Sequence, residues 1–133
     1  MNSNELRRGN LIYDKLGRVV KIDEIREDTY TTRLSNKRKL KYHYHTSNPI
    51  PVTEERLNKL GFKQQIGFSI DTLSGILVVA HNDMDRWYVF FQNLNKGEFP
   101  DCTTLRNDLR YIHQLQNIYY VLNSTELPTP TNF

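Results

Sequence analysis

Residues 49–62 read PIPVTEERLNKLGF and contain the clearest local structural signal in the chain. Thr53 can accept a hydrogen bond from the free backbone N–H groups at the start of a helix. The two glutamates after it are favourable there, because the first turn of a helix carries partial positive charge. Val52 and Leu57 have the spacing of a hydrophobic staple, and Gly61 can adopt the left-handed conformation that ends many helices. We therefore expect a short helix over residues 54–60, between two β-rich parts of the chain.

The part that precedes this helix is predicted to be a small, bent antiparallel sheet. Alternating side chains and turn residues indicate short strands at residues 11–13, 18–25, 29–34 and 39–45. Gly17 fits the turn between the first two strands, because glycine tolerates a positive φ. A change of parity near Asp23 and Glu24 predicts a β-bulge. Glycine turns between short strands at this spacing favour an SH3-like barrel.

The part that follows the helix is predicted to contain a second antiparallel sheet and a C-terminal helix. Strands are expected around residues 66–71, 75–81 and 86–92, with turns at 81–85 and 95–97. Residues 103–110 fit either an edge strand or the start of a helix. From Tyr111 onward, apolar residues recur at helical spacing at Ile112, Leu115, Ile118, Tyr119 and Leu122.

The fold class predicted from these elements is α+β, as one compact domain over residues 1–123. Its SH3-like β part covers residues 5–50, and residues 53–123 hold the short helix, the second sheet and the C-terminal helix. Residues 124–133, with two prolines among threonines, are expected to form a flexible tail. The strand at 75–81 is apolar on both faces, so helices or a second subunit must cover it, and a homodimer is a further prediction.

Composition excludes two classes of protein. The chain has 133 residues, of which 38% are hydrophobic and 25% are charged, values too apolar for intrinsic disorder. Its longest apolar run, residues 76–80, is far too short to span a bilayer, and the N-terminus lacks the apolar stretch of a signal peptide. A single cysteine, Cys102, fits a reducing cytosol, so we expect a cytoplasmic protein without membrane partners.

Positive charge is concentrated in one stretch of a chain whose formal net charge is only +3. No Asp or Glu occurs between Asp28 and Glu54. The five basic residues in this interval are Arg33, Lys37, Arg38, Lys39 and Lys41, with His43 and His45 beside them. A local positive field favours an acidic partner, although such stretches are also common as solvated surface.

The residues KLKYHYH at 39–45 make the most informative pattern within this basic segment. In a strand, Lys39, Lys41, His43 and His45 would share one face, with Tyr42 and Tyr44 on the other. Basic groups neutralise phosphates and tyrosine rings stack on bases, whereas tyrosine and arginine also anchor protein interfaces. The alternative is an edge strand whose tyrosines fill the core and whose basic face stays solvated.

Metal-binding and catalytic motifs are weak in this sequence. His43 and His45 offer two imidazoles to a metal but no third ligand nearby, and the turn at 81–85 holds His81 and two aspartates, which are too few for a calcium loop. No nucleophile elbow, phosphate loop or zinc-protease helix is present. Cys102 has no base near it in sequence, and His113 is expected to orient the C-terminal helix rather than to act as a base. We predict no metal, no cofactor and no catalytic residue.

Three blocks of the sequence carry a family resemblance. They are NELRRGNLIY at residues 4–13, IPVTEERLNKLGF at residues 50–62 and YIHQLQNIYYVL at residues 111–122. Their combination resembles an uncharacterised family of small proteins encoded in bacteriophages and prophages. The resemblance implies a phage setting and the cytoplasm of a bacterial host, and it implies no particular activity. The basic segment at residues 33–48 matches none of these blocks.

The leading hypothesis is a non-catalytic, phage-type binding protein. It would engage an acidic partner through segment 33–45. The predicted partner-binding residues are Arg33, Lys37, Arg38, Lys39, Lys41, Tyr42, His43, Tyr44 and His45. That partner would be a host or defence-system protein, or a nucleotide ligand. Binding would inhibit the host defence. One alternative is an accessory module that binds DNA or RNA, and another is a small enzyme with a site assembled from distant residues.

Overall fold

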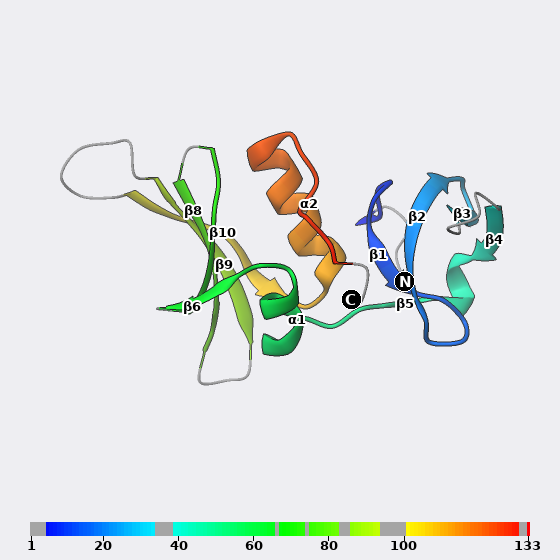
Figure 1. Ribbon diagram of the computed structural model, residues 1–133, viewed down its shortest axis with the longest axis horizontal. Coiled ribbons are helices and arrows are strands. Elements are labelled where there is room, and N and C mark those ends of the chain that lie inside the picture. Colours follow the sequence, from blue (N-terminus) through cyan, green and yellow to red (C-terminus); the bar gives the residue numbers. More distant parts are fainter. Residues whose placement is uncertain are drawn as a thin grey trace. The chain divides into compact units, whose positions relative to one another are not determined.

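The structure is a computed structural model of the 133-residue chain. It describes residues 5–33, 39–65, 67–73, 75–82, 86–93, 101–130 and 133. The fold is α+β, with two antiparallel sheets and a C-terminal helix, as predicted (Figure 1). Each sheet has five strands among the described residues. The chain forms two compact units. Unit 1 comprises Met1–Pro51 with Tyr111–Asn117, and unit 2 comprises Val52–Arg110 with Ile118–Phe133.

The sheet of unit 1 is an antiparallel meander whose last strand returns to the first. In order along the sheet the strands are β4, β3, β2, β1 and β5. A 3-10 turn at Tyr44–Thr46 precedes β5, which pairs with β1 and gives the strand order expected for an SH3-like sheet. The strands are β1 (Leu11–Tyr13), β2 (Val19–Ile25), β3 (Thr29–Arg33), β4 (Lys39–His43) and β5 (Asn48–Pro49).

Local sequence signals in unit 1 are largely confirmed. Gly17 has φ of 77° in the turn between β1 and β2, and the register between β2 and β3 shifts between Ile22 and Glu24, where the bulge was predicted. The predicted strand at 39–45 is too long, however. It ends at His43, because Tyr44 begins the 3-10 turn, in which the Ser47 N–H donates to the Tyr44 carbonyl.

The core of unit 1 is built around a tyrosine cluster. The Tyr30 ring lies 5.5 Å from the Tyr42 ring and 5.3 Å from the Tyr44 ring, and the Tyr30 hydroxyl is hydrogen-bonded to the Ser47 hydroxyl. Burial raises the pKa of Tyr30, and it also raises the pKa of Tyr44. These three rings pack with Leu6, Ile12 and Ile22, so aromatic stacking supplies much of this small core.

The helix between the two β-rich parts forms as predicted. Helix α1 (Glu54–Lys59) has Thr53 as its N-cap, whose side chain accepts a hydrogen bond of 3.2 Å from the Arg56 N–H. Gly61 has φ of 93°, so it provides the left-handed residue after the helix. Leu57 is fully buried, which fixes the face that the helix turns toward the protein interior.

The sheet of unit 2 has β8 at its centre, as its apolar sequence predicts. Segment 103–110, which the sequence left undecided between strand and helix, lies in an edge strand up to Leu109. A short strand before Gly67 was not anticipated. The turn residues 83–85 and 95–97 lie outside the described residues. The order is β10, β9, β8, β7, β6, with β6 (Lys63–Gln65), β7 (Gly67–Asp71), β8 (Gly75–His81), β9 (Trp87–Asn93) and β10 (Asp101–Leu109).

The C-terminal helix, α2 (Ile112–Asn123), confirms the helical periodicity. Its residues up to Asn117 belong to unit 1, a division that the sequence did not indicate. Beyond the helix, Leu127 is only 1% exposed. The segment after residue 123, which was expected to be a flexible tail, is therefore anchored at this leucine.

Replacing Leu115 with alanine should destabilise the protein by about 2–5 kcal/mol, because its side chain is fully buried and a cavity would remain. Val121→Ala on the same helix is the control, since Val121 is 80% exposed. Urea unfolding monitored by circular dichroism measures both effects. Equal stability of the two variants would contradict the assigned helix face.

Candidate functional site

Residues 39–43 of the basic segment form strand β4 at an edge of the sheet in unit 1. Strand β4 is an outer strand, and its register with β3 places Lys41 beside Thr31 and His43 beside Thr29. The side chains of Lys41 and His43 are exposed. The described part of this edge is therefore a solvent-facing strand with basic side chains on its outer face.

The tyrosines of the segment lie on the inner face. Tyr42 is 8% exposed and Tyr44 is 6% exposed, and both pack against Tyr30. Their inclusion among the partner-binding residues is therefore corrected, because rings packed in the core cannot stack on a ligand. The structure agrees with the edge-strand alternative, in which the tyrosines fill the core and the basic side chains face solvent.

His45 remains next to His43 although β4 has already ended. The two rings lie 5.4 Å apart at an angle of 47°, and both residues are exposed. Within the described residues, the side chains of Lys41, His43 and His45 form no hydrogen bond or ion pair, and no cluster of three or more His, Cys, Asp or Glu that could hold a metal ion occurs. The two imidazoles thus add polar surface beside Lys41.

The remaining basic residues of the segment are described incompletely. Arg33 and Lys39 are paired across β3 and β4 by their backbones, and nothing is described of their side chains. Lys37 and Arg38 lie outside the described residues. Their role in binding an acidic partner stays a prediction.

Several cations elsewhere in unit 1 are bound to the protein itself. The Arg18 Nε donates to the Asp14 carboxylate at 2.8 Å, and Arg8 lies 3.7 Å from the Asp23 carboxylate. The Arg7 Nε donates to the Asn117 side-chain oxygen at 3.1 Å. These contacts contrast with those of Lys41, for which the described residues supply no such partner.

Asp14 is a buried carboxylate that organises the turn between β1 and β2. Its burial alone would raise its pKa. Hydrogen bonds from the backbone N–H and the side chain of Arg18, and from the backbone N–H of Leu16, outweigh this effect and lower the pKa of Asp14. The carboxylate therefore stabilises the folded state only in its charged form.

A buried polar network joins two of the sequence blocks that carry the family resemblance. The Leu11 N–H donates to the Gln116 side-chain oxygen at 2.8 Å, and the Gln116 amide donates to the Gly9 carbonyl at 3.2 Å. The Asn10 amide donates to the Asn117 side-chain oxygen at 2.8 Å. This network was missed at the sequence level, where the only signal was polar side chains beside the apolar positions of the helix.

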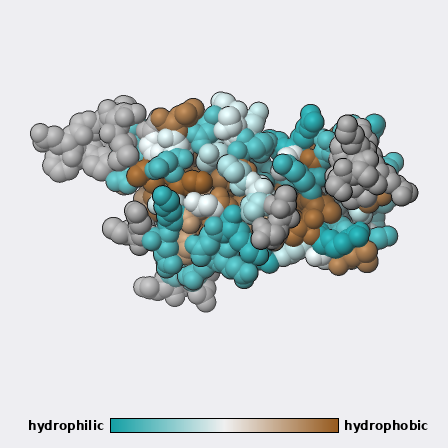
Figure 2. All heavy atoms as spheres, viewed as in Figure 1, coloured by the Kyte–Doolittle hydropathy of each residue, from teal (hydrophilic) through white to brown (hydrophobic). Residues whose placement is uncertain are grey.

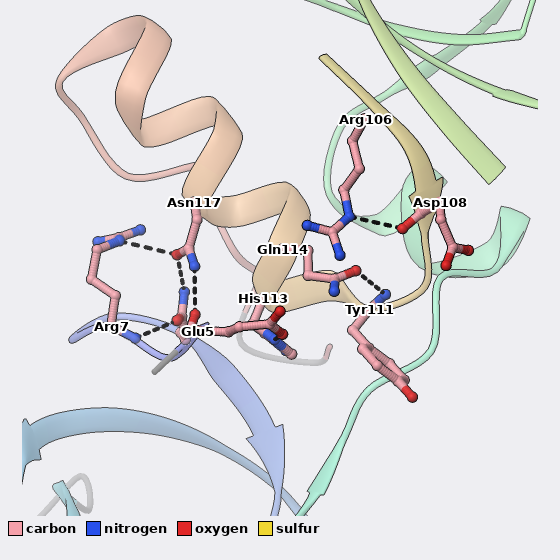
Figure 3. A network of polar contacts seen from close by, with 9 residues as sticks. Glu5, Arg7, Arg106, Asp108, Tyr111, His113, Gln114 and Asn117 are labelled. Atoms are coloured by element: carbon pink, nitrogen blue, oxygen red, sulfur yellow. Dashed lines mark hydrogen bonds and ion pairs between the residues drawn. The ribbon is translucent and has the colours of Figure 1, made fainter. Parts of the chain in front are cut away.

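His113 belongs to the same region of unit 1. It is 1% exposed, its Nε2 lies 3.6 Å from the Glu5 carboxylate, and its ring stacks on Tyr111 at 5.7 Å (Figure 3). A side chain so completely buried cannot reach a substrate in solvent. This geometry supports the interpretation that His113 orients the helix.

Two further residues considered in the sequence lie in unit 2. Cys102 is exposed on the edge strand β10, and His81 ends β8 with its ring 4.6 Å from the Trp87 ring. The face of the protein in Figure 2 is mostly hydrophilic, with smaller apolar patches. Exposed large apolar residues are spread along the described chain and include Leu16, Leu73 and Val121.

Comparison with protein-family models, with curated proteins and with solved structures finds no match to this chain. The resemblance to phage and prophage proteins therefore stays a prediction. No helix in the described part of the chain is long and apolar enough to cross a membrane.

Asp14→Asn should destabilise the protein by about 1–3 kcal/mol at neutral pH, since a charge-assisted network is lost. Because folding lowers the pKa of Asp14, its contribution is full above the ordinary aspartate pKa, about 3.9, and is lost as the pH falls through the lower folded value. Urea unfolding between pH 7 and pH 2 measures this, with the exposed Glu27→Gln as control. If the free energy of unfolding differed equally between the wild-type protein and the Asp14→Asn variant at every pH in that range, Asp14 would not be a structural anion.

Proposed function

We propose that this protein is a non-catalytic binding protein of phage type that engages an acidic partner through segment 33–45. Binding would occupy the basic outer face of strand β4, and its biological effect would be inhibition of a host defence protein in the bacterial cytoplasm. A homodimer is part of the same proposal. The phage setting rests on the three sequence blocks described above.

The observation that carries this proposal is the exposed basic surface at the end of a sheet. Lys41, His43 and His45 are solvent-exposed, and the described residues offer none of them an intramolecular hydrogen bond or ion pair. Unit 1 holds 11 of the 18 Lys and Arg residues but only 6 of the 15 Asp and Glu residues. A field of one sign favours encounter with a partner of the opposite sign.

Burial of the tyrosines favours a protein over a nucleotide as the partner. Recognition of a nucleotide normally combines phosphate contacts with stacking on the base, and Tyr42 and Tyr44 are unavailable for stacking because they form the core. An acidic protein surface needs only complementary charge and exposed edge groups. Nucleic acid remains the second candidate, because basic charge alone suffices for nonspecific binding to phosphates.

Replacing Lys37, Arg38, Lys39 and Lys41 together by serine should abolish capture of the partner from a nuclease-treated bacterial lysate. Lys41 is exposed, and substitutions at exposed sites typically change stability by less than about 0.5 kcal/mol, so the melting temperature should stay nearly constant. Capture is measured by affinity purification of the tagged protein followed by mass spectrometry.

The matched control removes four positive charges elsewhere, at the exposed residues Lys15, Lys21, Lys59 and Lys63. It should retain capture, because the proposal depends on local charge and not on net charge. Equal loss in both variants would contradict a local site. Capture that disappears after nuclease treatment, with retention on DNA that falls steeply with salt, would support the nucleic-acid alternative instead.

A further inference from the structure

Unit 2 contains an aromatic pocket that no part of the proposed function uses. Its volume is about 370 Å³, within the range of small-molecule sites. The lining includes four Phe, Tyr and Trp residues, a histidine and a glutamate. They are Phe68, Trp87, Tyr88, Phe90, His81 and Glu54.

The rings of this pocket hold one another in fixed orientations. The Trp87 ring lies 4.6 Å from the His81 ring and meets the Phe68 ring edge-on at 6.0 Å. Tyr88 and Phe90 lie on the opposite face of β9 from Trp87, and their rings are stacked at 6.0 Å. Trp87 is only partly buried and lines the pocket.

The pocket lining includes a glycine with a positive φ. Gly67 lines the pocket at the start of β7 and has φ of 81°, a conformation that side chains rarely adopt. A Cβ atom at this position would lie 3.1 Å from the Val79 carbonyl oxygen and 3.4 Å from the Ala80 Cβ. The backbone conformation therefore favours glycine here, and an added Cβ atom would in addition crowd strand β8.

The charge of the pocket selects the class of ligand. Glu54 is exposed at the first turn of α1, and no lysine or arginine of the described chain is among the lining residues. Unit 2 as a whole carries 9 Asp and Glu residues against 7 Lys and Arg residues. A carboxylate disfavours phosphates, whereas it complements a cation held against aromatic faces.

We infer that this pocket binds an alkylammonium cation. The ring face of Trp87, beside His81 and Phe68, would attract the positive charge through its quadrupole, and Glu54 would supply the counter-charge. A methylated ammonium head fits this combination best, because its methyl groups bury apolar area against the rings while the charge stays diffuse. This site does not depend on the basic segment of unit 1.

The single tryptophan of the chain lines this pocket, so its fluorescence reports occupancy directly. Choline should change the Trp87 emission in a saturable way, and the neutral isostere 3,3-dimethyl-1-butanol should change it little. A peptide that contains trimethyl-lysine, compared with choline, distinguishes a protein-borne ammonium group from a free one. Glu54→Gln should weaken binding of the better probe at least about fivefold.

Glu55→Gln provides the matched control, because Glu55 is the next residue on the same helix and is not among the lining residues. It should leave the affinity unchanged. Both glutamates are exposed, so neither substitution should prevent folding, which circular dichroism can verify. An equal response to the neutral isostere, an unaltered affinity of the Glu54 variant, or tighter binding of adenosine monophosphate than of choline would overturn the assignment.

Discussion

The tyrosine cluster of unit 1 determines which side of strand β4 meets solvent. Successive side chains of a strand point to opposite faces, so packing Tyr42 against Tyr30 obliges Lys41 and His43 to point outward. A register shift of one residue would bury a lysine and expose the tyrosine, at a cost that the small core could not sustain. The exposed basic surface is therefore a consequence of the way in which the core is packed.

The parts of the fold that depend on residues close together in the sequence could be predicted from it. The N-cap at Thr53, the positive φ of Gly61 and the bulge after Ile22 each arise within a few residues of chain. Segment 103–110 could not be assigned, because pairing with β9, rather than its own propensity, makes residues 103–109 a strand. The edge position of β4 is equally a property of the sheet order.

The candidate site could be predicted only in part, for the same reason. Alternation in residues 39–43 indicates a strand with two different faces. Only the positions of Tyr30 and Ser47 in the structure show which of these faces packs into the core. The polar network around Gln116 was beyond sequence reasoning, since it joins residues 105 and 107 positions apart. Its amide satisfies backbone groups at the start of β1 that would otherwise be buried without a partner. This explains why polar side chains occur on an otherwise apolar helix.

Lysines on an edge strand also protect a protein from aggregation, and this role must be weighed against partner binding. Protection requires charge of either sign, because any desolvated ion opposes the pairing of a second strand. Residues 29–53 contain five Lys and Arg residues and neither Asp nor Glu, a one-sidedness that protection does not need. Alternating signs would protect the edge equally well and would attract an anion less strongly. The uniform sign of this segment therefore favours recognition of an acidic surface as the reason for its composition.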